Sequence, residues 1–305
     1  MRVLFVADYF VDTPGDSGGS YPGGAEQTDA AVIDACPWPV ERVQVKDLRE
    51  SSLEGAELIL VGNLDTSTRA QCDAIARTGR HVLFEHDYRM CRLRGSYGAR
   101  WTHRWSGRCF CRLPRFKALF ARALGAVFLT HRQLDRYLEN PFLRLPAHDV
   151  LGCSVMGDAF FAAVKEQRER PVEKHGTVVV HSSHAFKGFQ QSLEYCRRHG
   201  IEPTVVRDAA PAELLAVLAR SERLVFLPEW YEPASRLAVE ARFLGCEVVS
   251  NERLGVGGEA WWTEPDAVGL AVLAGAAARF WEMVDDFARR RAVSTESSQA
   301  SPAVR

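Results

Sequence analysis

The chain has 305 residues, of which 47% are apolar and 25% charged, and its formal net charge is −1. This length fits two domains, and the near-zero net charge gives no indication of a protein that binds a polyanion over its whole surface. The sequence lacks a run of about 18 apolar residues, so we expect no membrane-spanning helix. Residues 1–10 lack the pattern of a signal peptide, and the eight cysteines then indicate free thiols. We therefore expect a cytoplasmic protein.

Short apolar runs alternate with helical patterns through the first half of the chain. Buried strands are predicted at Val3–Ala7, Leu58–Gly62, Val82–Phe84 and Ala126–Leu129, and helices at Ala25–Ala35, Thr66–Arg77 and Pro114–Leu124. A glycine-rich loop after the first strand ends in Gly23 and Gly24 at a helix start. Exposed N–H groups and the helix dipole favour an anion at such a place, although an ordinary surface loop has the same composition.

A second series of the same kind follows Cys153. It predicts strands at Thr177–Val180, Thr204–Arg207, Leu224–Leu227 and Glu247–Ser250, and helices at Phe186–His199, Pro211–Ser221 and Ala234–Leu244. Continuous apolar strands that alternate with helices are typical of parallel sheets covered on both faces. The expected organisation is therefore α/β, with Rossmann-like domains at 1–152 and 153–265. One long helix within 266–292 is expected to pack back on the first domain, and a disordered tail is expected at 293–305.

The second half carries the most informative polar residues. Lys187 follows a predicted strand and a lysine there can hold a diphosphate, although a solvated lysine is equally common. Glu232 lies between a predicted strand and a helix, and Glu240 lies within that helix. Arg236 and Glu240 are four residues apart, which also fits a surface ion pair. Since ligands bind at the carboxyl ends of strands in open α/β sheets, these side chains are candidates for a site.

These segments together resemble the retaining GT-B glycosyltransferases, the group similar to family 4. Glu232 and Glu240, with seven residues between them, look like the E-x7-E motif of that group. The pair Lys187-Gly188, the run Gly23–Glu26 and the segment Ser154–Phe160 resemble three further marks. The compact chain, with its EHDY and EPASR segments, is similar to short phage and environmental members. The resemblance implies two parallel sheets that face a central cleft.

The resemblance also implies roles for single residues and a nucleotide-sugar donor, with a UDP-sugar expected first and no catalytic metal. Catalytic roles fall to His86, Lys187 and Glu232, and donor contacts to Gly23, Gly24, Lys187, Ser235, Arg236 and Glu240. Lys187 would neutralise the diphosphate, Glu240 would bind the ribose and Glu232 the sugar. Ser182 stands where the group usually has an arginine, so positive charge has to come from another residue, such as His184 or Arg236.

A basic stretch interrupts the first half. Between Asp87 and Asp135 there is no acidic residue but eleven lysines and arginines, with interleaved aromatic residues. Such asymmetry predicts an anionic acceptor. Nucleic acid, with DNA modification as the activity, a lipid phosphate, an anionic glycan and a membrane surface all fit it. A basic surface balanced by acidic neighbours is the plain alternative. The predicted acceptor-binding residues of this insert, 88–122, are Arg89, Arg92, Arg94, Arg104 and Trp101.

The same insert contains Cys91, Cys109 and Cys111, with His103 nearby. Three thiolates and one imidazole can form a closed structural zinc site. The C-x-C spacing is unlike that of a standard zinc finger, and buried reduced thiols explain the residues as well.

Two other classes of function compete with a glycosyltransferase. Ser182 and the basic insert also fit a nucleic-acid-binding protein on a degenerate transferase scaffold. A sugar-nucleotide epimerase of related fold fits less well, because its architecture gives the insert no place.

Overall fold

The computed structural model describes residues 1–12, 23–91, 111–182 and 184–299, with side chains described as far as residue 290. Its first half is a six-stranded sheet with the order β2-β1-β3-β4-β5-β6, and every strand pair is parallel. The strands are β1 Val3–Ala7, β2 Val40–Gln44, β3 Leu58–Val61, β4 His81–Glu85, β5 Gly125–Phe128 and β6 His148–Val150. The helices of this half are α1 Gly24–Asp34, α2 Arg69–Thr78, α3 Leu113–Arg122 and α4 His131–Leu138.

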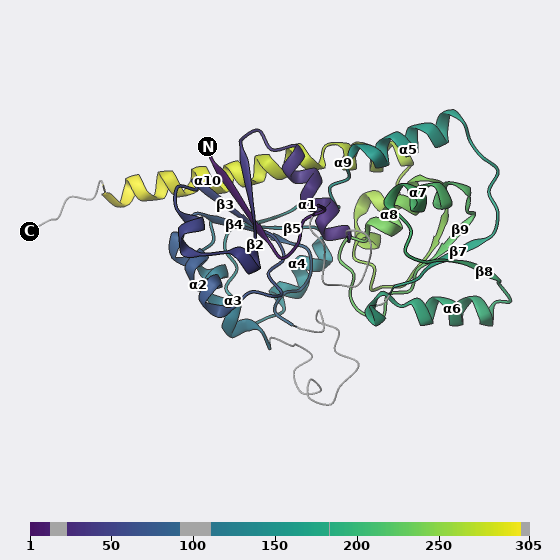
Figure 1. The fold of residues 1–305 in the computed structure, drawn as a ribbon, viewed down its shortest axis with the longest axis horizontal. Coiled ribbons are helices and arrows are strands. Elements are labelled where there is room, and N and C mark those ends of the chain that lie inside the picture. Colours follow the sequence, from purple (N-terminus) through teal and green to yellow (C-terminus); the bar gives the residue numbers. More distant parts are fainter. Residues whose placement is uncertain (13–22, 92–110, 183, 300–305) are drawn as a thin grey trace, which may run out of the picture.

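The second half is a smaller parallel sheet with the order β10-β9-β7-β8 (Figure 1). Its strands are β7 Thr177–Val180, β8 Pro203–Val206, β9 Arg223–Val225 and β10 Glu247–Val249. Its helices are α5 Asp158–Glu169, α6 Phe189–Arg198, α7 Pro211–Arg220 and α8 Arg236–Phe243, followed by α9 Asp266–Ala274 and α10 Ala276–Gln299. Two parallel sheets in one chain confirm the predicted α/β fold.

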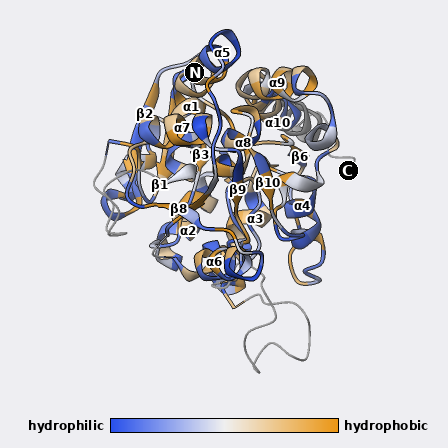
Figure 2. Cartoon of the chain, turned by 90° about the vertical axis from the view of Figure 1, so that its right-hand side faces the viewer, coloured by the Kyte–Doolittle hydropathy of each residue, from blue (hydrophilic) through white to orange (hydrophobic). Residues whose placement is uncertain are grey.

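Burial explains why the central strands form where they do. Every residue of β1, β3, β4 and β5 is buried, as expected for strands covered by helices on both faces. The helices are amphipathic instead: α5 buries Phe160 and Val164 and exposes charged residues (Figure 2). The two halves therefore have the layered construction that continuous apolar strands require.

Several elements differ from the sequence prediction. The edge strands β2 and β6 and the helices α4 and α5 were not expected. Glu41 and Arg42 are exposed in β2, so this strand lacks the apolar run that marks a central strand. Helix α6 begins at Phe189 and not at Phe186, because Gly188 has a left-handed backbone and the three residues before it form a 3-10 turn.

The C-terminal region also departs from its prediction. The single long helix is divided into α9 and α10 at Gly275, and α10 extends to Gln299. Helix α10 therefore runs into the segment from residue 293 that the sequence pattern predicts to be disordered. Residues 300–305 of the expected tail lie outside the described residues.

Helix α10 lies along the first sheet (Figure 1). Its Phe287 lies over Gly125 of β5, where a Cβ atom would come within 2.3 Å of the ring. Trp281 donates from its indole nitrogen to the carbonyl of Val32 in α1, at 2.9 Å. The ring of Phe280 lies 4.6 Å from that of Phe84 in β4. These contacts hold helix α10 against the first half.

In the described part of the chain, no individual helix has both the length and the apolar character needed to cross a bilayer. The helices Asp266–Ala274 and Ala276–Arg290 meet that test of length and composition only as a pair, with a bend of 46° between them.

Candidate functional site

The order of the strands identifies a switch point in each sheet. In the first sheet the chain moves from β1 to β2 and then to β3 on the other side, and in the second it moves from β7 to β8 and then to β9. The order of the strands thus reverses between β1 and β3 and between β7 and β9. Ligands of open α/β sheets bind beside such a switch point, at the carboxyl ends of the strands.

Lys187 and Glu232 meet at the switch point of the second sheet. Lys187 follows β7 and Glu232 follows β9, and the Lys187 Nζ lies 2.6 Å from Glu232 Oε1. The lysine side chain is 34% exposed and the glutamate 11%. Two residues that the sequence predicts for a donor site are therefore in direct contact across two strands, and the lysine can still be reached from solvent.

Gly188 makes this contact possible. Its φ is 72°, and a Cβ atom at this position would lie only 1.7 Å from the carbonyl oxygen of Leu227. A side chain is thus excluded both by the backbone conformation and by the neighbouring strand end. The glycine lets the turn that carries Lys187 lie against the segment that leads to Glu232.

The backbone of Glu232 is held by the loop after β10. Its N–H donates to the carbonyl of Arg253 at 2.9 Å, and its own carbonyl accepts from the N–H of Gly255 at 2.8 Å. A Cβ atom at Gly255 would lie 2.3 Å from the carbonyl oxygen of Pro233. Gly255 therefore allows the loop after β10 to pair with the backbone around Glu232, and this pairing fixes the position of Glu232.

The start of α8 brings the other predicted donor residues together. Ser235 caps the helix, because its hydroxyl accepts from the N–H of Ala238. Arg236 Nε lies 3.6 Å from Glu240 Oε1, and a terminal nitrogen of Arg236 donates to the carbonyl of Val155 at 2.6 Å. Both charged side chains are about nine-tenths covered, at 9% and 10% exposure, so they are not the surface ion pair that their spacing also allowed.

Burial alters this pair electrostatically. It raises the pKa of Glu240, an effect that Arg236 partly offsets. The Nε of Arg236 has no hydrogen-bond partner among the described residues. A buried cation that keeps an unsatisfied donor is costly for folding, which makes a bound anion a reasonable partner for it.

Arg236 also joins the second half to the first. A Cβ atom at Gly24 would lie 3.5 Å from the Cδ of Arg236. The N-terminus of α1 therefore faces the N-terminus of α8, with the aliphatic part of the Arg236 side chain between them. Gly23, Gly24, Ser235 and Arg236, which lie far apart in the sequence, thus belong to one region.

Glu26 lies at the same helix terminus, where the sequence predicts an anion site. Its carboxylate accepts a hydrogen bond from its own backbone N–H, and a Cβ atom at Gly23 would lie 2.6 Å from its Oε2. Burial raises the pKa of Glu26, and nearby Asp29 adds to the effect. A side chain of the protein therefore lies where a phosphate of the ligand was expected.

His86 is buried at the carboxyl end of β4 and pairs with Asp29 of α1. Its Nε2 lies 2.6 Å from Asp29 Oδ1, and its ring lies 4.4 Å from that of Phe84. Burial by itself lowers the pKa of His86, but Asp29, Asp87 and Glu26 together raise it above the ordinary value. Sequence reasoning missed Asp29, since one acidic residue within a helix carries no signal before β4 is placed beside it.

The buried position of Arg89 contradicts its predicted role in acceptor binding. Instead of reaching toward an acceptor, it is buried, with its Nε 2.8 Å from Glu85 Oε2 and a terminal nitrogen 2.7 Å from Glu85 Oε1. Its backbone N–H donates to the hydroxyl of Tyr137 at 3.0 Å, and that hydroxyl also contacts Glu85. The glutamate four residues earlier and the tyrosine of α4 draw the arginine into the interior, where it supports the end of β4.

The other predicted acceptor residues, Arg92, Arg94, Arg104 and Trp101, lie outside the described residues. So do Cys109 and His103 of the proposed zinc site, while Cys91 is buried and Cys111 exposed. Within the described ranges, no group of three or more His, Cys, Asp or Glu side chains could hold a metal ion. Within the basic stretch, the charge of Arg112 is neutralised by Asp65, and Arg115 donates to the backbone carbonyl of the same residue.

Helix α4 contacts the second half through its N-terminus. The backbone N–H of His131 donates to Glu259 Oε1 at 2.8 Å, and the His131 ring nitrogen Nδ1 lies 2.8 Å from Glu259 Oε2. The hydroxyls of Thr130 and Tyr231 lie 3.3 Å apart. Tyr231 immediately precedes Glu232, so these contacts tie the candidate donor segment to the first half.

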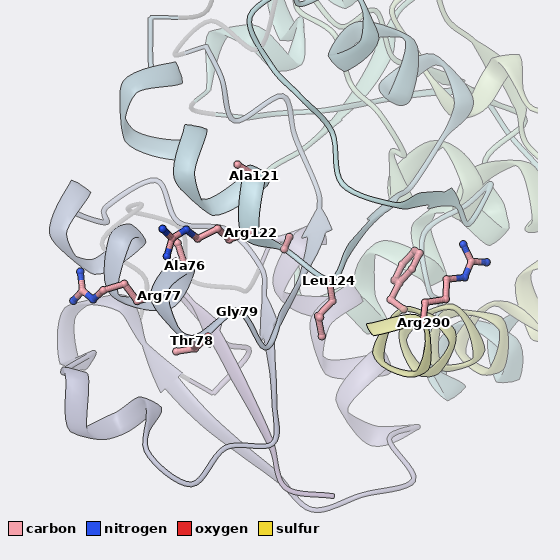
Figure 3. Close-up of a pocket in the computed structure, with 10 residues that line it drawn as sticks. Ala76, Arg77, Thr78, Gly79, Ala121, Arg122, Leu124 and Arg290 are labelled. Atoms are coloured by element: carbon pink, nitrogen blue, oxygen red, sulfur yellow. The ribbon is translucent and has the colours of Figure 1, made fainter. Parts of the chain in front are cut away.

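A hollow of ≈ 510 Å³ lies elsewhere, on the first half between the ends of α2 and α3 and helix α10 (Figure 3). Three arginines line it, but Arg77 pairs with Glu50 and Arg290 pairs with Asp286. None of its lining residues is a predicted site residue. This hollow is therefore separate from the switch points.

No protein-family model matches the chain, and no curated protein sequence matches it. Solved structures match its fold over nearly the whole length. Sucrose-phosphate synthase from Thermosynechococcus elongatus aligns with a TM-score of 0.53 at 13% identity, covering 98% of this chain and 100% of that chain. Anabaena HepE in complex with UDP aligns with a TM-score of 0.51 at 14% identity, covering 97% and 100%.

A third match is a UDP-forming α,α-trehalose-phosphate synthase from Burkholderia xenovorans, in complex with glucose-6-phosphate. It aligns with a TM-score of 0.51 at 12% identity, and the alignment covers 97% of this chain and 100% of that chain. Matches at this level of identity concern the arrangement of the backbone. They show that this chain, with its two parallel sheets, has the fold of GT-B glycosyltransferases.

Proposed function

We propose that the protein is a glycosyltransferase that binds a nucleotide-sugar donor between its two halves and transfers the sugar with retention. The observation that carries this proposal is the grouping at the switch points: Lys187 contacts Glu232, and Arg236 lies between Gly24 and Glu240. A nucleotide sugar has an anionic diphosphate and the hydroxyls of a ribose and a sugar. The two cations and two helix N-termini suit the diphosphate, and the two carboxylates can accept hydrogen bonds from the hydroxyls. The retention follows from the resemblance to the E-x7-E group.

In this proposal the leaving diphosphate determines the chemistry. As the bond to the sugar breaks, negative charge grows on the diphosphate, and Lys187, Arg236 and the N-terminal amides of α8 stabilise it. Glu240 accepts hydrogen bonds from the ribose hydroxyls, and Glu232 does so from the sugar. The two halves hold the acceptor hydroxyl near the donor and exclude water, which would otherwise hydrolyse it. None of these steps needs a catalytic metal.

A UDP-sugar is the donor that we propose. HepE binds UDP in its solved complex, and the trehalose-phosphate synthase is named as UDP-forming. The acceptor that we propose is anionic, because the stretch between Asp87 and Asp135 contains eleven basic residues and no acidic one. Because Arg89 is buried, the other basic residues of the insert 88–122 would supply the charge.

The same basic stretch supports a second candidate, a nucleic-acid-binding protein on this scaffold. Binding to single-stranded DNA that weakens steeply with salt, without any release of nucleoside diphosphate, would favour it. A thermal-shift screen with UDP-, GDP-, ADP- and TDP-sugars tests the main proposal, since a ligand that binds the native state raises the melting temperature. Release of nucleoside diphosphate from a stabilising donor would support the enzyme, and no shift with any donor would oppose it.

A further inference from the structure

The strongest feature that the proposed function leaves unexplained is the buried pair of His86 and Asp29. Both side chains are almost inaccessible, at 4% and 3% exposure, and their polar atoms lie 2.6 Å apart. Burying two ionisable groups is costly even when they are hydrogen-bonded to each other, and two apolar residues of similar volume could fill the same space at less cost. The geometry therefore points to a function for the pair beyond folding.

The surrounding backbone makes room for Asp29. A Cβ atom at Gly62, immediately after β3, would lie 3.1 Å from Asp29 Oδ2. In α1 the hydroxyl of Thr28 donates to the carbonyl of Gly24 at 2.8 Å, so the turn that carries Asp29 is tied to the turn that faces α8. Asp29 follows Gly24 by five residues, or about 7 Å along the helix axis. Asp29 therefore lies between one and two helical turns from Gly24, the residue that faces Arg236.

The groups around His86 are mostly acidic. Helix α1 contributes Asp29 and Glu26, and Asp87 follows β4, while Arg89 is the cation that acts on Asp29 from the same loop. Arg89 is itself paired with Glu85, which neutralises much of its charge. An imidazole in this setting gains from being protonated, and both of its nitrogens are then hydrogen-bond donors.

We propose that Asp29 is a positioning residue that holds His86 as a fixed imidazolium, and that this imidazolium donates a hydrogen bond to the bound donor. This inference rests on the proposed function and deepens it, since it assigns His86 the role of a cation and not that of a base. A protonated imidazole is unable to accept the proton of the acceptor hydroxyl. His86 therefore adds positive charge near the donor, at a site where Ser182 replaces an expected arginine.

The test compares Asp29→Asn with Asp34→Asn, an exposed aspartate of the same helix, in the full chain. NMR titration of the His86 ring, which needs no substrate, should give a lower midpoint in Asp29→Asn than in wild type and an unchanged midpoint in Asp34→Asn. With UDP-glucose or whichever nucleotide sugar proves active, Asp29→Asn should lower kcat by about tenfold or more, with a much smaller change in KM. Asp29→Glu, which keeps the carboxylate, should recover part of both losses.

The two proposals can fail separately. If the wild type binds no nucleotide sugar, the proposed function fails while the titration still reports on the pair. If the wild type is active, an unchanged His86 titration and an unchanged pH profile of kcat in Asp29→Asn overturn the positioning role. If Asp29→Asn fails to fold, the kcat of Asp29→Glu decides, because the longer carboxylate displaces the imidazole. A positioning role requires this kcat to lie below that of the wild type, and a wild-type kcat overturns it.

Discussion

Gly188 and Leu227 are in backbone contact: a Cβ atom on the glycine would come within 1.7 Å of the leucine carbonyl oxygen. This approach brings the turn after β7 against the segment after β9, and it is the reason that Lys187 reaches Glu232 at 2.6 Å. The chemistry of the proposed site thus depends on a residue with no side chain.

Replacement of Gly188 by alanine should disturb both stability and donor binding. The left-handed backbone alone costs a residue with a side chain about 1 kcal/mol, and the clash with Leu227 adds to that. Gly200 is the matched control, because its φ is 65° and nothing lies within 4 Å of a Cβ atom there. Urea denaturation of both variants measures the difference. Equal losses of stability in the two variants would show that the contact with Leu227 is unimportant.

Lys187→Met should reduce the release of nucleoside diphosphate by orders of magnitude, because the leaving group loses a cation placed against it. Lys165→Met is the control, since the Lys165 side chain is 75% exposed and pairs with Glu169 in its own helix. Steady-state kinetics with a saturating donor measures the effect. Wild-type turnover in the Lys187 variant would remove that lysine from the mechanism.

Glu26→Gln should strengthen donor binding. The Glu26 carboxylate lies over Gly23 at the start of α1, where it competes with a phosphate for the same N–H groups. Calorimetry should give a several-fold lower Kd for the variant, on the order of 1 kcal/mol. An unchanged Kd would mean that the phosphates bind at α8 alone.

The pair of His86 and Asp29 should make stability depend on pH. Because the folded pKa of His86 is raised, the contribution of the pair is fully present below the unfolded value of about 6.5 and is lost as pH rises through the folded pKa. The difference in unfolding free energy between wild type and Asp29→Asn should therefore be larger at pH 6 than at pH 9. A difference that is constant over this range would contradict a charged His86.

Lys174 should be important for stability and unimportant for catalysis. Its Nζ donates to the carbonyls of Ala219 at 2.8 Å, Ser221 at 3.2 Å and Leu244 at 2.7 Å, at the ends of α7 and α8. Loss of these charge-assisted hydrogen bonds in Lys174→Met should cost about 2 kcal/mol. Donor affinity should stay within about twofold of wild type, and thermal unfolding with calorimetry checks both expectations.

The sequence patterns were sufficient to predict the central strands of the two sheets but not the edge strands β2 and β6. The bounds of β1 follow from an uninterrupted apolar run and those of β7 from Thr177 and the three valines after it, because strands buried on both faces favour apolar and β-branched residues. Strand β2 contains Glu41 and Arg42 and is held in place by its pairing with β1, so its own composition gives little indication of a strand. An edge strand of this kind therefore depends on its pairing with a neighbouring strand, which the local sequence does not reveal.

The same distinction applies to the site. The contact of Lys187 with Glu232 was predictable, because both follow strands that meet at a switch point. The role of Asp29 and the burial of Arg89 were not predictable. Asp29 meets His86 only once α1 packs beside β4, and Arg89 meets Glu85 only once the loop after β4 folds back over the end of that strand. Local charge patterns suggest binding residues, but only packing separates an arginine that binds a ligand from one that supports a strand.

Calorimetric titration of the wild type, Lys187→Met and Glu240→Ala with UDP-glucose and related nucleotide sugars is the decisive measurement for the proposed donor site. At least one nucleotide sugar should bind the wild type, and both substitutions should weaken the same binding event. Binding of no nucleotide sugar, or binding that neither substitution changes, would contradict the proposed donor site.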